Sequence, residues 1–316
     1  MKLYANEPGL AEQLLASAAP SVTLRSGVPG HLSRLPFARE LAKIHLRALL
    51  HWKQTPGWLA LLNSHPAFSD YLRNYPKFLY KVYRPYISHA LRPEQRLEAI
   101  RAHYGFVFRR GLGQLVARAS LGPVLLAETA GRSGLPYRIE LRTVNMFDRE
   151  GELALQLTQD GKALYTVAFT IAARDGVEAV NLGCLQGGKT EDAREAIRIA
   201  TRELHGMRPK QLMVSLVQQL GHDYGCARLV MVSNRNRVIY KAIRHGRVLA
   251  DYDQLWEELG ARPRADGDFE LDCTPLAALD LEQIPSKKRS EARKRYELVR
   301  TLAEDVSLSL RAREPG

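Results

Sequence analysis

Apolar residues recur along this chain with two different periods, and the period changes near residue 120. Between residues 36 and 119 they are spaced as on the faces of helices, so that Ile44 and Ala48, for example, share one face. Beyond residue 122 the pattern alternates or runs apolar, as it does in strands, at 124–127, 137–146, 152–159, 163–173 and 178–185. Asp160 followed by Gly161 favours a two-residue hairpin between two of these runs. We therefore predict a helical N-terminal region followed by an antiparallel meander.

The segment 205–240 organises the second half of the pattern. Leu212, Leu216 and Leu220 recur every four residues and predict an amphipathic helix over 209–223. Pro209 suits its first turn, where a missing N–H costs nothing, and Gly225 suits the left-handed position at which such a helix ends. The apolar run at 229–232 then predicts a strand that is covered on both faces.

Ser233 and Asn234 follow that strand at its carboxyl end, the edge at which open α/β sheets bind ligands. A ligand site is therefore expected here. Further helices are predicted at 191–204, 253–259 and 281–310, and an edge strand at 268–271. We divide the chain into a loosely ordered lead-in (1–35), a helical region (36–119) and a mixed α/β domain (120–316) that ends in a long basic helix.

Composition and charge narrow the functional classes. The chain has 316 residues, 45% of them hydrophobic and 25% charged, which is typical of a globular protein. Its N-terminus lacks the continuous apolar core of a secretion signal, and we expect a cytoplasmic protein without a transmembrane segment. The net charge of +12 favours an anionic partner: a phosphorylated cofactor, anionic lipid or nucleic acid, although no nucleic-acid-binding motif accompanies the charge.

Cysteine and histidine spacing predicts neither a disulfide framework nor a metal site. The three cysteines are far apart, with no CxxC pair, and the nine histidines form no HxH or HExxH pattern. We expect Cys184 and Cys226 to be buried as small apolar residues.

Two stretches combine basic residues with apolar ones. In 63–86 seven aromatic residues alternate with Arg73, Lys77, Lys81 and Arg84, which predicts a helical layer whose rings pack inward while the basic groups reach water. In 287–295 six of nine residues are basic, and the simplest interpretation is a solvated helix. Binding of bases, phosphates or a membrane surface by either stretch stays open.

Five motifs taken together resemble a known family. They are GCLQGG at 183–188, HGMRPK at 205–210, VSN at 232–234, YDQLWEE at 252–258 and SKKRSEARKRYEL at 286–298. In this order they resemble the VirK/YbjX family of Gram-negative bacteria over residues 37–298. The resemblance implies a cytoplasmic protein linked to virulence, envelope integrity and tolerance of antimicrobial peptides, and it implies no established reaction.

The second half also resembles the acyl-CoA N-acyltransferase superfamily, in which an antiparallel meander leads to a strand whose end splays open. The predicted fold class is therefore α/β (α+β): a helical N-terminal layer followed by a mixed, largely antiparallel sheet of N-acyltransferase-like type. The resemblance implies a cleft between the loops 185–190, 205–210 and 233–240 that binds acyl-CoA or another acyl donor. The implied cofactor-binding residues are Gln186, Gly187, Gly188, His205, Gly206, Arg208 and Lys210. Tyr240, as the acid for a leaving thiolate, and Asn234 are the implied catalytic residues. Arg208 and Lys210 stand where that superfamily has glycines.

Two alternatives stay open. Residues 183–190 match the phosphate-loop pattern G-x-x-x-x-G-K-[ST], in which Lys189 would contact phosphates and Thr190 a magnesium ion. The other alternative is a non-catalytic adaptor whose basic faces bind anionic lipid, an envelope factor or nucleic acid.

Overall fold

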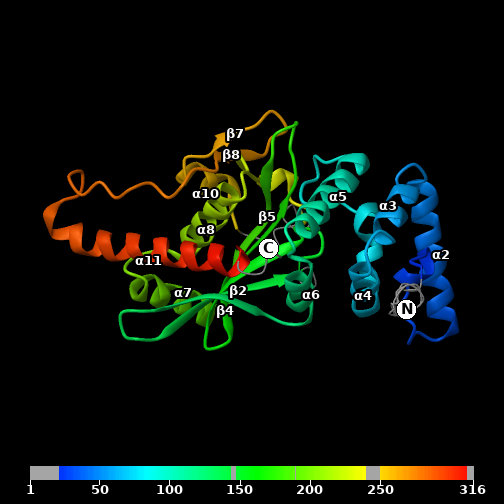
Figure 1. Ribbon diagram of the computed structural model, residues 1–316, viewed down its shortest axis with the longest axis horizontal. Helices are drawn as coiled ribbons and strands as arrows, with labels where there is room; N and C mark the ends of the chain where they lie inside the picture. The colour runs from blue at the N-terminus through cyan, green and yellow to red at the C-terminus, as the bar shows by residue number, and fades with distance from the viewer. Residues whose placement is uncertain (1–20, 144–146, 189, 240–249, 312–316) are drawn as a thin grey trace, which may run out of the picture. The chain divides into compact units, whose positions relative to one another are not determined.

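The computed structural model describes residues 21–143, 147–188, 190–239 and 250–311 (Figure 1). Two compact units make up the chain, Met1–Tyr83 and Arg84–Gly316. The division falls after Tyr83, not after residue 119 as the change of period had suggested.

The first unit is helical. It contains η1 (Leu24–Gly27), α2 (Arg34–Leu50), α3 (Thr55–Leu62), α4 (Ala67–Asn74) and η2 (Pro76–Tyr83). Its core gathers aromatic rings: Trp58 and Phe68 both lie against Phe78, with ring centres 5.7 and 6.4 Å apart. The predicted inward packing of the rings in 63–86 is confirmed at these positions, which leaves them unavailable for stacking on bases. Lys81 is an exception to the expected outward basic groups, because it is fully buried with its ammonium 4.9 Å from the ring centre of Phe78.

Two helices open the second unit, in the region where the sequence predicted helical spacing up to residue 119. They are α5 (Pro93–Arg109) and α6 (Gly113–Leu121). Gly111 lies between them with a left-handed φ of 63°, a conformation that ends a helix. α5 packs against β4, and α6 against β1 and β2. These contacts place both helices in the same unit as the sheet.

An eight-stranded sheet forms the centre of the second unit, in the order β1-β2-β3-β4-β5-β6-β8-β7. The strands are β1 (Val124–Ala130), β2 (Pro136–Thr143), β3 (Leu153–Gln159), β4 (Lys162–Ile171), β5 (Ala179–Gly187), β6 (Arg228–Met231), β7 (Arg262–Pro263) and β8 (Phe269–Asp272). All neighbours are antiparallel except β5 and β6. Asp160 and Gly161 both have left-handed φ angles, 48° and 71°, as a type I′ hairpin requires. The predicted mixed, largely antiparallel fold is confirmed.

Besides α5 and α6, the described part of the chain packs further helices around this sheet: α7 (Glu191–Glu203), α8 (Pro209–Asp223), α10 (Tyr252–Glu258) and α11 (Ser286–Arg311). α8 buries its predicted leucine stripe against β3, β4, β5 and β6, and α11 runs beside α8 and β1 (Figure 1). Gly225 follows α8 with φ 77°, as predicted. The predicted helix over 281–310 begins only at Ser286, directly after Pro285, because proline disfavours a helical conformation in the residue before it.

Candidate functional site

The parallel strands β5 and β6 pair over only four residues. Their last pair is Leu182 with Met231, after which the N–H of Val232 donates to the carbonyl of Leu182 at 3.0 Å. β5 continues to Gly187 although β6 has ended. The backbone of β5 therefore needs another partner on this edge, at the position where the resemblance to acyltransferases implied a splayed strand.

Side chains of α10 supply that partner. The Tyr252 hydroxyl donates to the carbonyl of Leu185 at 2.6 Å and accepts from the N–H of Leu185 at 2.7 Å. The indole N–H of Trp256 donates to the carbonyl of Val232 at 2.9 Å. Both rings are almost completely buried, and the guanidinium of Arg237 lies 3.7 Å from the ring centre of Tyr252. A ligand that used the backbone of Leu185 would first have to displace Tyr252.

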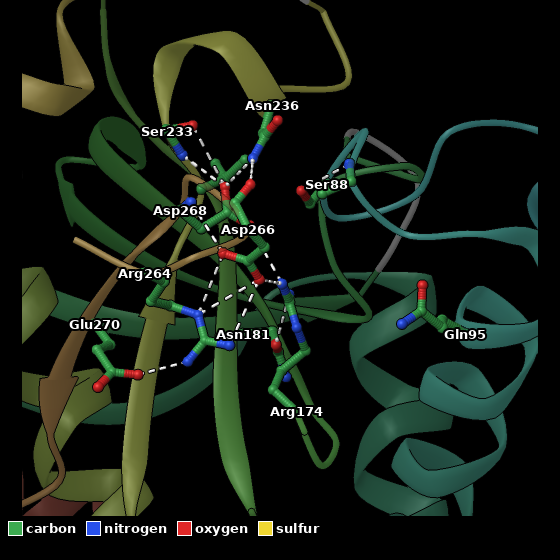
Figure 2. Close-up of polar contacts among 12 residues, drawn as sticks. Ser88, Gln95, Arg174, Asn181, Ser233, Asn236, Arg264, Asp266, Asp268 and Glu270 are labelled. Carbon is green, nitrogen blue, oxygen red and sulfur yellow. Dashed lines mark hydrogen bonds and ion pairs between the residues drawn. The ribbon is translucent and has the colours of Figure 1, made fainter. Parts of the chain in front are cut away.

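A buried polar network holds the turn that follows β6 (Figure 2). The carboxylate of Asp268 accepts from the N–H of Ser233 at 3.0 Å and from the side-chain amide of Asn236 at 2.9 Å. Arg174 pairs with Asp268 at 3.3 Å and with Asp266 at 2.5 Å. Burial raises the pKa of Asp266, but the N–H of Asp268 and the charge of Arg174 outweigh it and lower that pKa below its ordinary value. These carboxylates are engaged in holding the turn.

Asn234 lies in this turn, in η3 (Asn234–Asn236), and is bonded to the start of α10. Its amide nitrogen donates to Asp251 at 2.7 Å, and its amide oxygen accepts from the N–H of Tyr252 at 2.9 Å. Its backbone N–H donates to the carboxylate of Asp253 at 2.7 Å. The side chain thus positions α10 and, through it, Tyr252. Tyr240, the other predicted catalytic residue, lies outside the described residues.

The phosphate-loop alternative at 183–190 does not fit the described backbone, and Lys189 itself lies outside the described residues. Residues 183–187 are the end of strand β5, so only two residues connect the strand to Thr190, the N-cap of α7. The glycines serve packing: a Cβ at Gly187 would lie 2.7 Å from the ring of Tyr165 and 2.8 Å from Ile197, and one at Gly188 would overlap Ala193. The Thr190 hydroxyl accepts from the N–H of Ala193 at 3.2 Å, and is therefore a helix cap.

The turn at His205, by contrast, borders a hollow. His205 and Gly206 join α7 to α8 with left-handed φ angles of 55° and 78°. A groove of about 720 Å³ opens beside them, bounded by the β1–β2 turn and by the first three turns of α11. Its lining residues are Gly131, Arg132, His205, Lys287, Ser290, Glu291 and Lys294. We call this the His205 groove.

Arg132 is held in place at one wall of the His205 groove. Its backbone N–H donates to the carbonyl of Glu203 at 3.1 Å, and its Nε donates to Nδ1 of His205 at 3.2 Å. Its guanidinium also forms an ion pair with Glu291 of α11. Gly131 allows this arrangement, because a Cβ there would lie 2.6 Å from the carboxylate of Glu203. Residues far apart in the chain thus form one prearranged basic wall.

The electrostatics of the groove favour an anion. Burial, together with the charges of Arg132 and Lys294, lowers the pKa of His205 below its ordinary value, and Glu291 and Glu203 oppose this only partly. Burial is the largest cause of this shift, and the positive charges of Arg132 and Lys294 lower the pKa further, as charges that attract an anion do. Because Nδ1 of His205 accepts from Arg132, the neutral ring carries its proton on Nε2.

The remaining predicted cofactor residues are dispersed. Gly206 faces α11, since a Cβ on it would lie 3.7 Å from the guanidinium of Arg295. Arg208 is the exposed N-cap of α8. Lys210 forms an ion pair with Glu258 of α10 at 3.2 Å. Of the predicted set, only His205 lines the groove, and Gln186 lies in the end of β5 beside β4.

Sequence reasoning did not single out Arg132. The only local signal is a basic residue in a Gly-Arg-Ser-Gly turn between two strands. Lys287 and Lys294 were noted as part of a basic stretch, without a partner. Their spacing of seven residues places them on one face of a helix, which could have suggested a shared site.

The cysteine side chains are all buried. Cys184 and Cys226 are buried as predicted, and Cys273 is also buried. Burial raises the pKa of Cys226 to about 11 and that of Cys273 to about 12, which keeps both thiols protonated at neutral pH. Within the described residues, no group of three or more His, Cys, Asp and Glu side chains is placed to share a metal ion. Nor does any helix in this part of the chain have the length and apolar character that spanning a membrane requires.

Comparisons with known proteins support the family resemblance. A model described as "Protein of unknown function (DUF535)" matches residues 36–307. The uncharacterized protein YbjX of Escherichia coli (strain K12) is 28% identical over 275 residues, which is 85% of this chain and 83% of that protein. An uncharacterized protein of Haemophilus influenzae is 23% identical over 269 residues, 85% of this chain and 88% of that one. The predicted VirK/YbjX resemblance is confirmed.

A mutant of a cAMP-binding acyltransferase from Mycobacterium smegmatis is a structural neighbour at a TM-score of 0.31. It is 13% identical, and the similarity covers 65% of this chain and 62% of that protein. A similarity this low carries no argument about function.

Proposed function

The chain belongs to the DUF535 family, described as a protein of unknown function, and from its geometry we propose that it binds a phosphorylated ligand in the His205 groove. The observation that carries the proposal is the convergence of Arg132, Lys287 and Lys294 on one hollow beside His205. Its volume lies within the roughly 300–1,000 Å³ typical of ligand pockets.

The basic wall is able to exchange partners. The ion pair between Arg132 and Glu291 is about half exposed on both sides, and exposed ion pairs contribute little stability. A phosphate entering the groove can therefore take Arg132 from Glu291 at small cost and form bidentate hydrogen bonds with it. Lys287 and Lys294 lie two turns apart on one face of α11, and they add two further positive charges.

The test is binding of inorganic pyrophosphate, measured by calorimetry with two double variants. Lys287→Ala with Lys294→Ala removes two charges from the groove. Lys288→Ala with Arg293→Ala removes two exposed charges from the same helix, away from the groove. We expect the first pair to weaken binding about tenfold, or about 1.4 kcal/mol, and the second pair to change it less than about twofold. Equal losses in both would mean diffuse attraction by net charge, and would contradict the proposal.

Coenzyme A and anionic vesicles distinguish the possible sources of the phosphate. A nucleotide ligand is expected to compete with pyrophosphate for the groove as a free molecule. A lipid ligand would compete only when its headgroup is presented in a vesicle or micelle. Failure of every phosphorylated probe to bind at low ionic strength would remove the proposal altogether.

A second candidate is acyl transfer, favoured by the end of β5, which β6 leaves unpaired. It requires Tyr252 to leave Leu185 so that the arm of an acyl donor can take its place. Binding of acyl-CoA should then be clearly tighter than binding of the nucleotide portion of coenzyme A alone. Equal affinities would show that only the phosphates are recognised, and would leave this candidate without support.

A further inference from the structure

Helix α2 in the first unit carries an exposed apolar face. Five large apolar side chains within 18 residues of sequence are mainly exposed: Leu35 (84%), Leu46 (58%), Leu49 (69%), Leu50 (71%) and Trp52 (65%). Other exposed large apolar side chains of the described chain are scattered over the second unit: Leu121, Leu125, Leu135, Val177, Ile199 and Leu308. A cluster of this kind marks an interaction surface, whereas scattered exposed leucines need no explanation.

The spacing of the leucines places them on one side of α2. At about 100° per residue, Leu35, Leu46 and Leu49 fall within a sector of about 60°. The opposite side of the helix holds Ile44 and Ala48, both buried, and packs against η1 and η2. The helix therefore has one apolar side that belongs to the core and another that faces outward.

Basic residues border the outward side. Arg39 and Lys43 lie along it, and Lys53 holds its ammonium 5.5 Å from the ring centre of Trp52. From residue 34 to residue 53 the chain has five basic residues and one acidic residue, Glu40. Glu40 is already engaged, because it pairs with Lys43 at 3.2 Å and accepts from the hydroxyl of Tyr80 at 3.2 Å. The surface is thus apolar at its centre and positive at its margin.

We propose that the outward face of α2 docks on the surface of an anionic lipid bilayer, with its leucines among the acyl chains and its basic side chains at the headgroups. Helices that lie in the bilayer interface have this distribution, and a tryptophan at the end of the helix suits the headgroup level. The proposal goes beyond ligand binding in the His205 groove, because it uses a different unit and different residues.

Charge argues for lipid over a second copy of the chain. Two copies joined through this face would bring two positive margins together, and like charges in an interface oppose association. An anionic bilayer attracts the same margins, because its negative surface potential favours Lys and Arg side chains close to the headgroups.

The test is co-sedimentation of the full chain with vesicles that contain phosphatidylglycerol, compared with vesicles of phosphatidylcholine alone. We expect binding to the anionic vesicles and at least about tenfold weaker binding after Leu46→Gln with Leu49→Gln. The matched control is Leu121→Gln with Leu308→Gln, which changes two equally exposed leucines of the second unit. The control should bind as the unchanged chain does, and equal losses in both pairs would overturn the proposal.

Four further measurements keep the outcome decisive. Trp52 fluorescence should shift to the blue on anionic vesicles, whereas Trp58 and Trp256 are already buried. The Lys287→Ala, Lys294→Ala variant should still bind vesicles, which separates this proposal from ligand binding in the His205 groove. Leucine-dependent dimers in light scattering, or vesicle binding that appears only when residues 1–20 are deleted, would assign the face to another occupant and overturn the proposal.

Discussion

His205 adopts a backbone conformation that residues with a side chain rarely occupy. Its φ of 55° costs roughly 1–2 kcal/mol relative to a right-handed conformation. Glycine at position 205 would avoid much of that cost, as Gly206 does at the next position, which is also left-handed. Strained residues cluster at functional sites, and here the imidazole ring has a function that glycine could not supply. Its Nδ1 accepts the hydrogen bond that orients Arg132.

At the residue scale we predict that anion binding is coupled to protonation of His205. The free protein has a lowered pKa at His205, so the ring is neutral near neutral pH. A bound anion favours the imidazolium and raises that pKa. Between the two pKa values the complex takes up a proton, and the affinity rises as the pH falls until the free protein is also protonated. Sulfate is the suitable probe, because its own charge does not change in this range.

The measurement is sulfate titration across pH, with the His205 ring followed by NMR. His205→Asn is the control, since asparagine tolerates the left-handed conformation but does not titrate. The variant should bind sulfate with little dependence on pH. An unchanged pH dependence in His205→Asn would place the titrating group elsewhere.

At the scale of elements, α10 replaces a strand partner for β5. The Tyr252 hydroxyl satisfies both backbone groups of Leu185, which strand pairing would normally satisfy. Burial raises the pKa of Tyr252 well above its ordinary value, so the hydroxyl keeps the proton that it donates. Asn234 fixes the start of α10, and a short helix is thereby held at the edge of a parallel strand pair.

We predict that Tyr252→Phe lowers the free energy of unfolding by about 1–3 kcal/mol, because it leaves two buried backbone groups without a hydrogen bond. Urea unfolding measures the change. Tyr296→Phe, on the half-buried Tyr296 of α11, is the control and should change it by less than about 0.5 kcal/mol. If the Tyr252→Phe variant were as stable as the unchanged chain, water or a ligand would have to form the hydrogen bonds to the backbone N–H and carbonyl of Leu185.

At the scale of the whole molecule, the division after Tyr83 gives α5 and α6 a structural role in the sheet unit. Ile100, Tyr104 and Val107 of α5 are buried, and the hydroxyl of Tyr104 donates to the buried carboxylate of Glu152 at 2.8 Å. A buried carboxylate that loses a donor is strongly destabilising.

The envelope and virulence link implied by the family resemblance stays a prediction, to which the vesicle experiment is relevant.

We therefore predict that a fragment spanning residues 84–316 folds by itself, whereas a fragment spanning 120–316 does not. Both contain the complete sheet, and they differ only in α5, α6 and the short segment before α5. Circular dichroism and cooperative urea unfolding test this. A cooperative transition in the shorter fragment would restore the boundary that the change of hydrophobic period suggested.

Much of the fold was predictable because its signals are local. The leucine stripe of α8, the caps at Pro209 and Gly225, and the hairpin at Asp160 all depend on residues a few positions apart. The break at Gly111 was not predicted, because the helical spacing of apolar residues extends to residue 119 and glycine within a helical pattern is ambiguous. The burial of Lys81 was missed because an amphipathic pattern assigns every basic group to water.

The sequence by itself determined the kinds of elements, their order and the position of a turn with His205 between two helices. Tertiary structure alone decided what meets at that turn, because Arg132 is 73 residues from His205 and 159 from Glu291. It also decided that Tyr252 reaches Leu185 across 67 residues. The period of the apolar residues shows which side of a helix or strand is apolar. Which distant turns come together depends instead on where the twisted sheet places the end of each strand. No local sequence pattern specifies those positions.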